Sequence, residues 1–156
     1  MKKQKSICLV LSLMLVLVTC FSPLNIFAEE LDTPVHEDPI DEIETWSGTE
    51  SRTGLHFSYY VSSTGNYSTL ICSSSAIITC SWREPVEGTG NISYASISVS
   101  NVKIDNVSKV ALAQGGTIYQ NGKARQKFLV SGTTLYFWIE LSCNHYGEIQ
   151  FVAYKA

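Results

Sequence analysis

Residues 135–143 read LYFWIELSC, and their pattern is the clearest indication of the fold class. Apolar side chains occupy every second position from Leu135 to Cys143, and residues of mixed polarity stand between them. A period of two is typical of a β-strand with one buried face, because successive side chains point to opposite sides of a sheet. The stretch therefore predicts a strand whose odd-numbered side chains face a core.

The same alternation recurs elsewhere in the chain. It is found in residues 55–61, 76–83 and 95–99, and residues 149–154 form a last apolar run. No apolar spacing typical of a helix follows residue 46. We expect an all-β fold, an antiparallel two-sheet β-sandwich of about eight short strands, with a small closed β-barrel as the alternative.

Turn-forming residues separate these apolar runs. The strongest signal is Asn121-Gly122, because both residues tolerate the positive φ that a two-residue hairpin requires. Clusters rich in Gly, Ser, Thr and Asn predict further turns at residues 63–66, 73–75, 87–91 and 114–116.

The first 28 residues have the three parts of an export signal. A start with lysines and no acid precedes an apolar run at 7–18, and Ala28 offers a small residue for cleavage. We expect a signal peptide over 1–28, a secreted protein and no integral membrane domain after cleavage, since a spanning helix needs about 20 apolar residues. The alternative is a lipid anchor at Cys20, because residues 17–20 resemble a bacterial lipobox. The lysine-only start also resembles export signals of Gram-positive bacteria.

The charges divide the remaining chain into two parts. Residues 29–45 hold eight acidic residues and no Lys or Arg, so we expect a disordered acidic linker there. Residues 46–156 hold six acidic and eight basic residues and are long enough for one domain with its own core. A balance this close to neutral argues against nucleic acid as the partner.

Three cysteines follow the export signal. If residues 73–75 turn the chain, Cys72 and Cys80 lie several residues apart along neighbouring strands, too far for a bridge. Cys80 and Cys143 both fall on the core side of their strands, so Cys80–Cys143 is the expected disulfide. The alternative is three buried thiols that behave as small apolar side chains.

Few residues suggest catalysis. Cys143 and His145 are two positions apart at a strand end, whereas thiol nucleophiles and their bases usually come from distant segments, and further metal ligands are missing. Glu84 and Glu87 share one loop and are the carboxylate pair available to a hydrolase. We expect no enzymatic activity, no cofactor and no metal site.

A strip of aromatic side chains is the expected ligand-binding site. A five-residue loop at 144–148 places Tyr154 opposite Trp138 in a final hairpin. Tyr136, Trp138 and Tyr154 then share the face opposite to the core, with Glu140 beside them. Such rings offer flat contact surfaces to sugars or proteins, unless another segment, such as the one with Trp46, covers them.

Three functions are compatible with these features. We expect first a secreted or surface-associated, non-enzymatic binding module that recognises a protein or glycan partner in the cell envelope or the environment. The second is a small secreted antagonistic factor, such as a toxin, a bacteriocin or an inhibitor. The third, a small hydrolase, rests on Glu84 and Glu87 alone.

Overall fold

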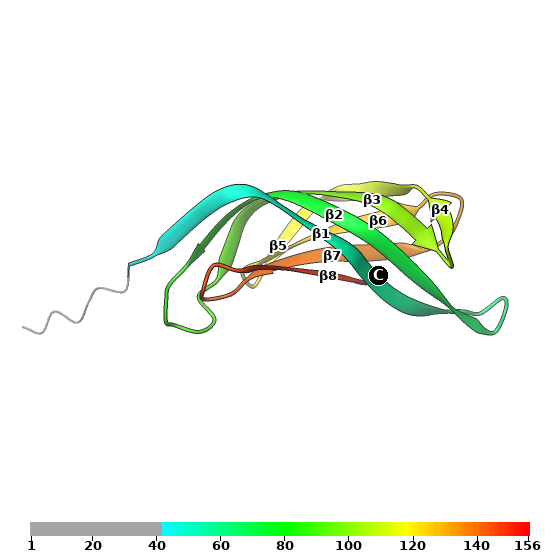
Figure 1. Cartoon of the computed structure of the whole chain (residues 1–156), viewed down its shortest axis with the longest axis horizontal. Helices are drawn as coiled ribbons and strands as arrows, with labels where there is room; N and C mark the ends of the chain where they lie inside the picture. Colours follow the sequence, from blue (N-terminus) through cyan, green and yellow to red (C-terminus); the bar gives the residue numbers. More distant parts are fainter. Residues whose placement is uncertain (1–41) are drawn as a thin grey trace, which may run out of the picture. The chain divides into compact units, whose positions relative to one another are not determined.

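A computed structural model describes residues 42–156 (Figure 1). The expected export signal at 1–28, with Cys20, lies outside the described residues, as do residues 29–41 of the acidic segment. The first strand begins at Glu44, two residues before the expected start of the domain.

The described chain forms eight strands and no helix. Their bounds are β1 Glu44–Val61, β2 Asn66–Trp82, β3 Asn91–Ile104, β4 Val107–Lys109, β5 Ala111–Gln120, β6 Lys123–Val130, β7 Tyr136–Cys143 and β8 Ile149–Lys155. Sheet A has the order β1-β2-β3-β4 and sheet B the order β5-β6-β7-β8, and all neighbours are antiparallel. The two separate sheets confirm the predicted sandwich and exclude the closed barrel.

The core lies between the sheets, and the alternation at 135–143 places β7 in it. All five odd-numbered side chains of that stretch are buried. Phe137 stacks on Phe128 of β6 at a centroid distance of 5.6 Å and lies 6.1 Å from Phe57 of β1. The contact between Phe57 and Phe137 joins the two sheets. Burial of each such side chain contributes about 1.5–3 kcal/mol to the stability of the fold.

The turn predicted at residues 73–75 is wrong, because these serines lie within β2. The hydroxyl of Ser51 donates a hydrogen bond of 3.0 Å to that of Ser75, and Ser98 donates to the Ser75 carbonyl at 3.1 Å. The Ser74 hydroxyl is buried and donates to the Ser98 carbonyl at 3.0 Å. Hydrogen bonds to both neighbouring strands thus replace the local bonds that favour serine in turns.

The turn predicted at residues 114–116 is also wrong, because it is a bulge within β5. The register of β5 against β6 shifts between Gln114 and Ile118, and Gly115 has a φ of 71°. The buried side chain of Gln126 donates to the carbonyls of Gln114 and Gly115 at 3.2 and 3.1 Å. A glycine in this left-handed conformation is typical of one class of bulge, and here Gln126 supplies hydrogen bonds to the carbonyls of the bulge.

The hairpin predicted at Asn121-Gly122 is confirmed. It joins β5 to β6, and its two residues have φ values of 52° and 72°. The predicted turn regions 63–66 and 87–91 also lie at strand connections, between β1 and β2 and between β2 and β3.

The two long edges of the sandwich differ. At one edge β3 faces β5, and the Tyr119 hydroxyl accepts a hydrogen bond of 2.9 Å from the Ala95 amide while Thr117 donates to the Ala95 carbonyl at 3.1 Å. The Ile92 amide also donates to the Gly122 carbonyl at 2.9 Å. At the other edge β1 and β8 are the outermost strands, and no ladder pairs them in the described part of the chain.

Candidate ligand-binding groove

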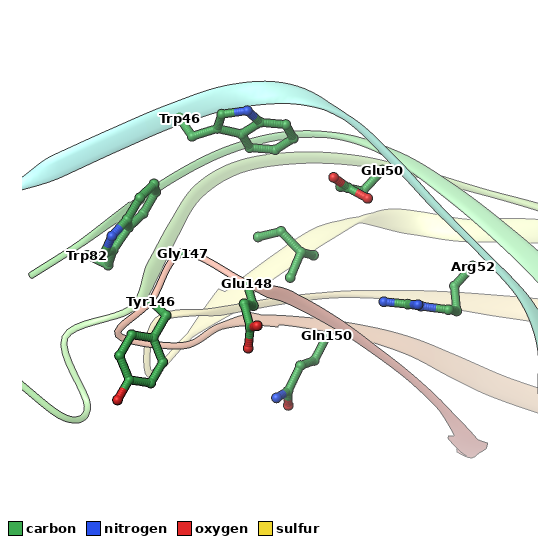
Figure 2. A pocket seen from close by; sticks show the side chains of 9 residues that line it. Trp46, Glu50, Arg52, Trp82, Tyr146, Gly147, Glu148 and Gln150 are labelled. Atoms are coloured by element: carbon green, nitrogen blue, oxygen red, sulfur yellow. The ribbon is translucent and has the colours of Figure 1, made fainter. Parts of the chain in front are cut away.

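A groove of about 550 Å³ opens at the edge between β1 and β8 (Figure 2). It is lined by side chains from both sheets and from the turn between β7 and β8. The aromatic members are Trp46, Trp82 and Tyr146, and the polar members are Glu50, Arg52, Glu148 and Gln150.

The side chains that β1 contributes to the groove lie at every second position of the strand. Trp46, Gly48, Glu50 and Arg52 alternate with side chains on the outer face of sheet A. A Cβ atom at Gly48 would overlap the Trp46 ring, so the indole lies along its own strand over the glycine. The missing side chain at residue 48 thus makes room for the indole beside Glu50.

The second tryptophan also lies against a glycine. Trp82 ends β2, and a Cβ atom at Gly147 would come within 2.6 Å of its ring. Gly147 has a φ of 78°, which favours glycine for a second reason. The turn between β7 and β8 therefore passes directly against the indole.

One side chain organises this turn. The side-chain carbonyl of Asn144 accepts hydrogen bonds from the amides of Tyr146 and Glu148, at 3.0 and 2.9 Å. Its side-chain amide donates to the Glu148 carboxylate at 2.7 Å. Asn144 thereby fixes the backbone of the turn at Tyr146 and the carboxylate of Glu148.

The composition of the groove suits a ligand with apolar faces and hydroxyl groups. Trp46 and Trp82 are partly buried and packed against the core, whereas Tyr146 is 56 % exposed. Figure 2 shows the two indoles and the tyrosine at one end, with Arg52 toward the other. Two carboxylates and one guanidinium give a mixed set of acceptors and donors beside the rings.

The aromatic strip predicted from the sequence lies elsewhere, on the outer face of sheet B. Trp138 pairs with Tyr154, as the five-residue loop predicted, and the core partners are Cys143 with Ile149 and Leu141 with Phe151. Glu140 accepts a hydrogen bond of 3.1 Å from Tyr154. Trp46 does not cover the strip but lines the groove.

Cationic side chains lie over the rings of this strip. The Arg125 guanidinium is 4.9 Å from the Trp138 centroid, and the Lys127 ammonium is 4.8 Å from that of Tyr136 and 5.7 Å from that of Trp138. These contacts compete with a sugar ring for the aromatic surfaces. The open groove is therefore the better place for a neutral sugar, which carries no charge to attract these cations.

The pair Cys80 and Cys143 comes from the two sheets, and both residues are buried. Burial and, second, the neighbouring Cys80 thiol raise the pKa of Cys143 to about 12. Both residues are free thiols here. Cys72 lies on the same strand as Cys80, about 26 Å away for eight residues at about 3.3 Å each, so these two cannot bridge even though the predicted turn between them is absent.

The residues considered for catalysis lie at two places, Glu84 and Glu87 between β2 and β3, and Cys143 and His145 at the end of β7 and in the turn after it. Glu84 and Glu87 are exposed in the loop between β2 and β3. His145 lies beside Tyr146, with ring centroids 4.0 Å apart. Residues 42–156 contain no group of three His, Cys, Asp or Glu placed to hold a metal ion. The same residues include no helix with the length and apolar content needed to cross a membrane.

Comparisons with protein-family models, with curated proteins and with solved structures find no match for this chain. The functional argument therefore rests on the groove itself, which sequence reasoning missed. Its signal in the sequence is weak: Trp46 precedes Gly48 by two residues, but nothing local indicates that Trp82 and Tyr146 join it.

Proposed function

We propose that this protein is an exported, non-enzymatic binding module that takes a glycan in the groove between β1 and β8. The observation that carries the proposal is the set of three aromatic rings, Trp46, Trp82 and Tyr146, in one groove with polar side chains. Aromatic rings contact the apolar C–H faces of sugars, while carboxylates, amides and guanidinium groups bind the hydroxyls.

The size of the groove favours a small ligand such as an oligosaccharide over a protein surface. Its volume of about 550 Å³ falls within the ~300–1,000 Å³ that is usual for small-molecule sites. The Gly48 and Gly147 contacts and the Asn144 hydrogen bonds hold its side chains in place before binding. Such preorganisation lowers the entropic cost of association.

A binding role accounts for the acidic side chains better than catalysis does. Glycosidases need one carboxyl that burial keeps protonated, and both Glu84 and Glu87 are exposed. We infer export from the sequence pattern of residues 1–28 and therefore expect the glycan partner in the cell envelope or the environment.

Binding to an array of neutral and envelope-derived oligosaccharides tests the proposal. Two of the three tryptophans line the groove, so a ligand should change the tryptophan fluorescence. For an oligosaccharide that binds, Tyr146→Ala should weaken binding about tenfold, because it removes one exposed ring.

Tyr67→Ala is the matched control, since Tyr67 is 75 % exposed in sheet A and does not line the groove. It should leave the affinity unchanged. Equal affinities for the protein and for Tyr146→Ala, or release of new reducing ends from the ligand, would contradict the proposal.

A further inference from the structure

The outer face of sheet B carries a row of cations. Lys123, Arg125 and Lys127 occupy alternate positions of β6, so their Cα atoms lie about 7 Å apart along the strand. The neighbouring strand β7 places Tyr136, Trp138 and Glu140 directly beside them. The outward-facing side chains of β6, β7 and β8 thus include three cations and one carboxylate.

The one carboxylate of this face is already neutralised. Lys123 forms an ion pair of 2.9 Å with Glu140, and Tyr154 donates a hydrogen bond of 3.1 Å to the same carboxylate. Burial alone would raise the pKa of Glu140, but the bonds from Lys123 and Tyr154 and the nearby charges lower it overall. Glu140 therefore stays ionised and paired with Lys123 near neutral pH.

The other two cations have no carboxylate partner within residues 42–156. The ion pair of Lys123 with Glu140 is the sole salt bridge there. Arg125 donates to the Gln120 side chain at 3.3 Å and lies over Trp138, and Lys127 lies over Tyr136 and Trp138. The rings hold both charges in place. Arg125 also lies opposite Glu140 in the ladder, but with one carboxylate for three cations the face keeps an excess of positive charge.

We propose that this face binds an acidic polysaccharide, independently of the groove. Such a polymer repeats a negative charge along its length, which complements cations spaced along one strand. Its sugar rings also present C–H faces to the exposed Tyr136 and to the half-buried Tyr154, which an acidic peptide would not do. Arg125 and Lys127 supply the free positive charges, and Glu140 positions Lys123.

Calorimetric titration with polygalacturonate tests this proposal on the purified protein. Binding is expected at low ionic strength and should weaken as the ionic strength rises toward 0.15 M, where the Debye length falls to about 8 Å. The double variant Arg125→Gln/Lys127→Gln should lose affinity by about tenfold or more. The control Lys103→Gln/Lys109→Gln makes the same charge change on sheet A and should bind as the protein does.

Three outcomes overturn the proposal. The first is that the unmodified protein does not bind polygalacturonate, or that the Arg125→Gln/Lys127→Gln variant binds it with unchanged affinity. The second is equal binding of poly-L-glutamate, which would assign the face to acidic peptides, and the third is equal binding of neutral dextran. Should the double variant not fold, Lys127→Gln alone is the test, because its ammonium contacts the rings at the surface. Tyr146→Ala should leave polygalacturonate binding intact, which separates this test from that of the groove.

Discussion

The indole of Trp82 lies so close to Gly147 that a Cβ atom at residue 147 would come within 2.6 Å of the ring. Gly147→Ala should therefore displace Trp82 and weaken glycan binding, and the overlap should cost about 1–3 kcal/mol of unfolding free energy. Gly132→Ala is the control, because Gly132 has a similar φ of 74° but open space around its Cβ position. Urea unfolding of both variants measures the difference. Equal losses would mean that the positive φ alone requires glycine at residue 147.

Removal of the Tyr119 hydroxyl should loosen the edge at which β3 faces β5. The hydroxyl accepts from the Ala95 amide, so Tyr119→Phe should lower the unfolding free energy by about 0.5–1.5 kcal/mol. Tyr94→Phe, at a residue of similar exposure on β3, should stay within about 0.5 kcal/mol. Thermal melting of the two variants compares them. No difference would indicate that water replaces the tyrosine hydroxyl without cost.

The contribution of Glu140 to stability should depend on pH. Hydrogen bonds from Lys123 and Tyr154 outweigh the opposing effect of burial and lower its pKa. A carboxyl with a lowered pKa stabilises the fold above its unfolded pKa of about 4.3, and this stability is lost as the pH falls through the folded value. At pH 7, Glu140→Gln should therefore melt at a lower temperature than the unchanged protein. The loss in unfolding free energy should be no more than about 1 kcal/mol, because the ion pair lies at the surface. The two melting curves should converge in acid, and a constant gap would contradict the assignment.

In the protein isolated from an oxidising medium, we expect one disulfide between Cys80 and Cys143 and a free Cys72. Closing a loop of this length stabilises the fold by at most about 4 kcal/mol in the chain-entropy model. Mass spectrometry after alkylation of the unfolded, unreduced chain identifies the modified cysteines. Alkylation of all three would support the alternative of buried thiols. In reduced protein the thiols should react slowly at pH 8, because burial raises the pKa of Cys72 to about 11 and that of Cys143 to about 12.

The sequence predicts those parts of the fold whose signals are local. The period of two at 135–143 identified β7 and its core face, and the loop length fixed the register that pairs Trp138 with Tyr154. The hairpin at Asn121-Gly122 followed from the conformational preferences of two adjacent residues. In each case the residues that decide the structure lie within about twenty positions of one another.

The features that the sequence analysis predicted wrongly or missed depend on residues that are distant from one another in the chain. Residues 73–75 favour a turn locally, but Ser75 takes its hydrogen bonds from Ser51 and Ser98, which lie 24 and 23 residues away. Residues 44–54 carry little apolar alternation, and they are a strand because they pair with β2. The groove depends on strand order, which alone brings Trp46 and Trp82 to the same edge as Tyr146.

The placement of β1 and β8 has a consequence for hydrogen exchange. Both are edge strands, and they are the first and last strands of the fold, so either can detach in a local unfolding event while the other strands stay paired. The groove is built on these two strands, and a detached strand cannot bind its ligand. A bound glycan should therefore slow amide exchange in β1 and β8 well beyond the residues that it touches, and exchange protection would map its site even before its chemical identity is known.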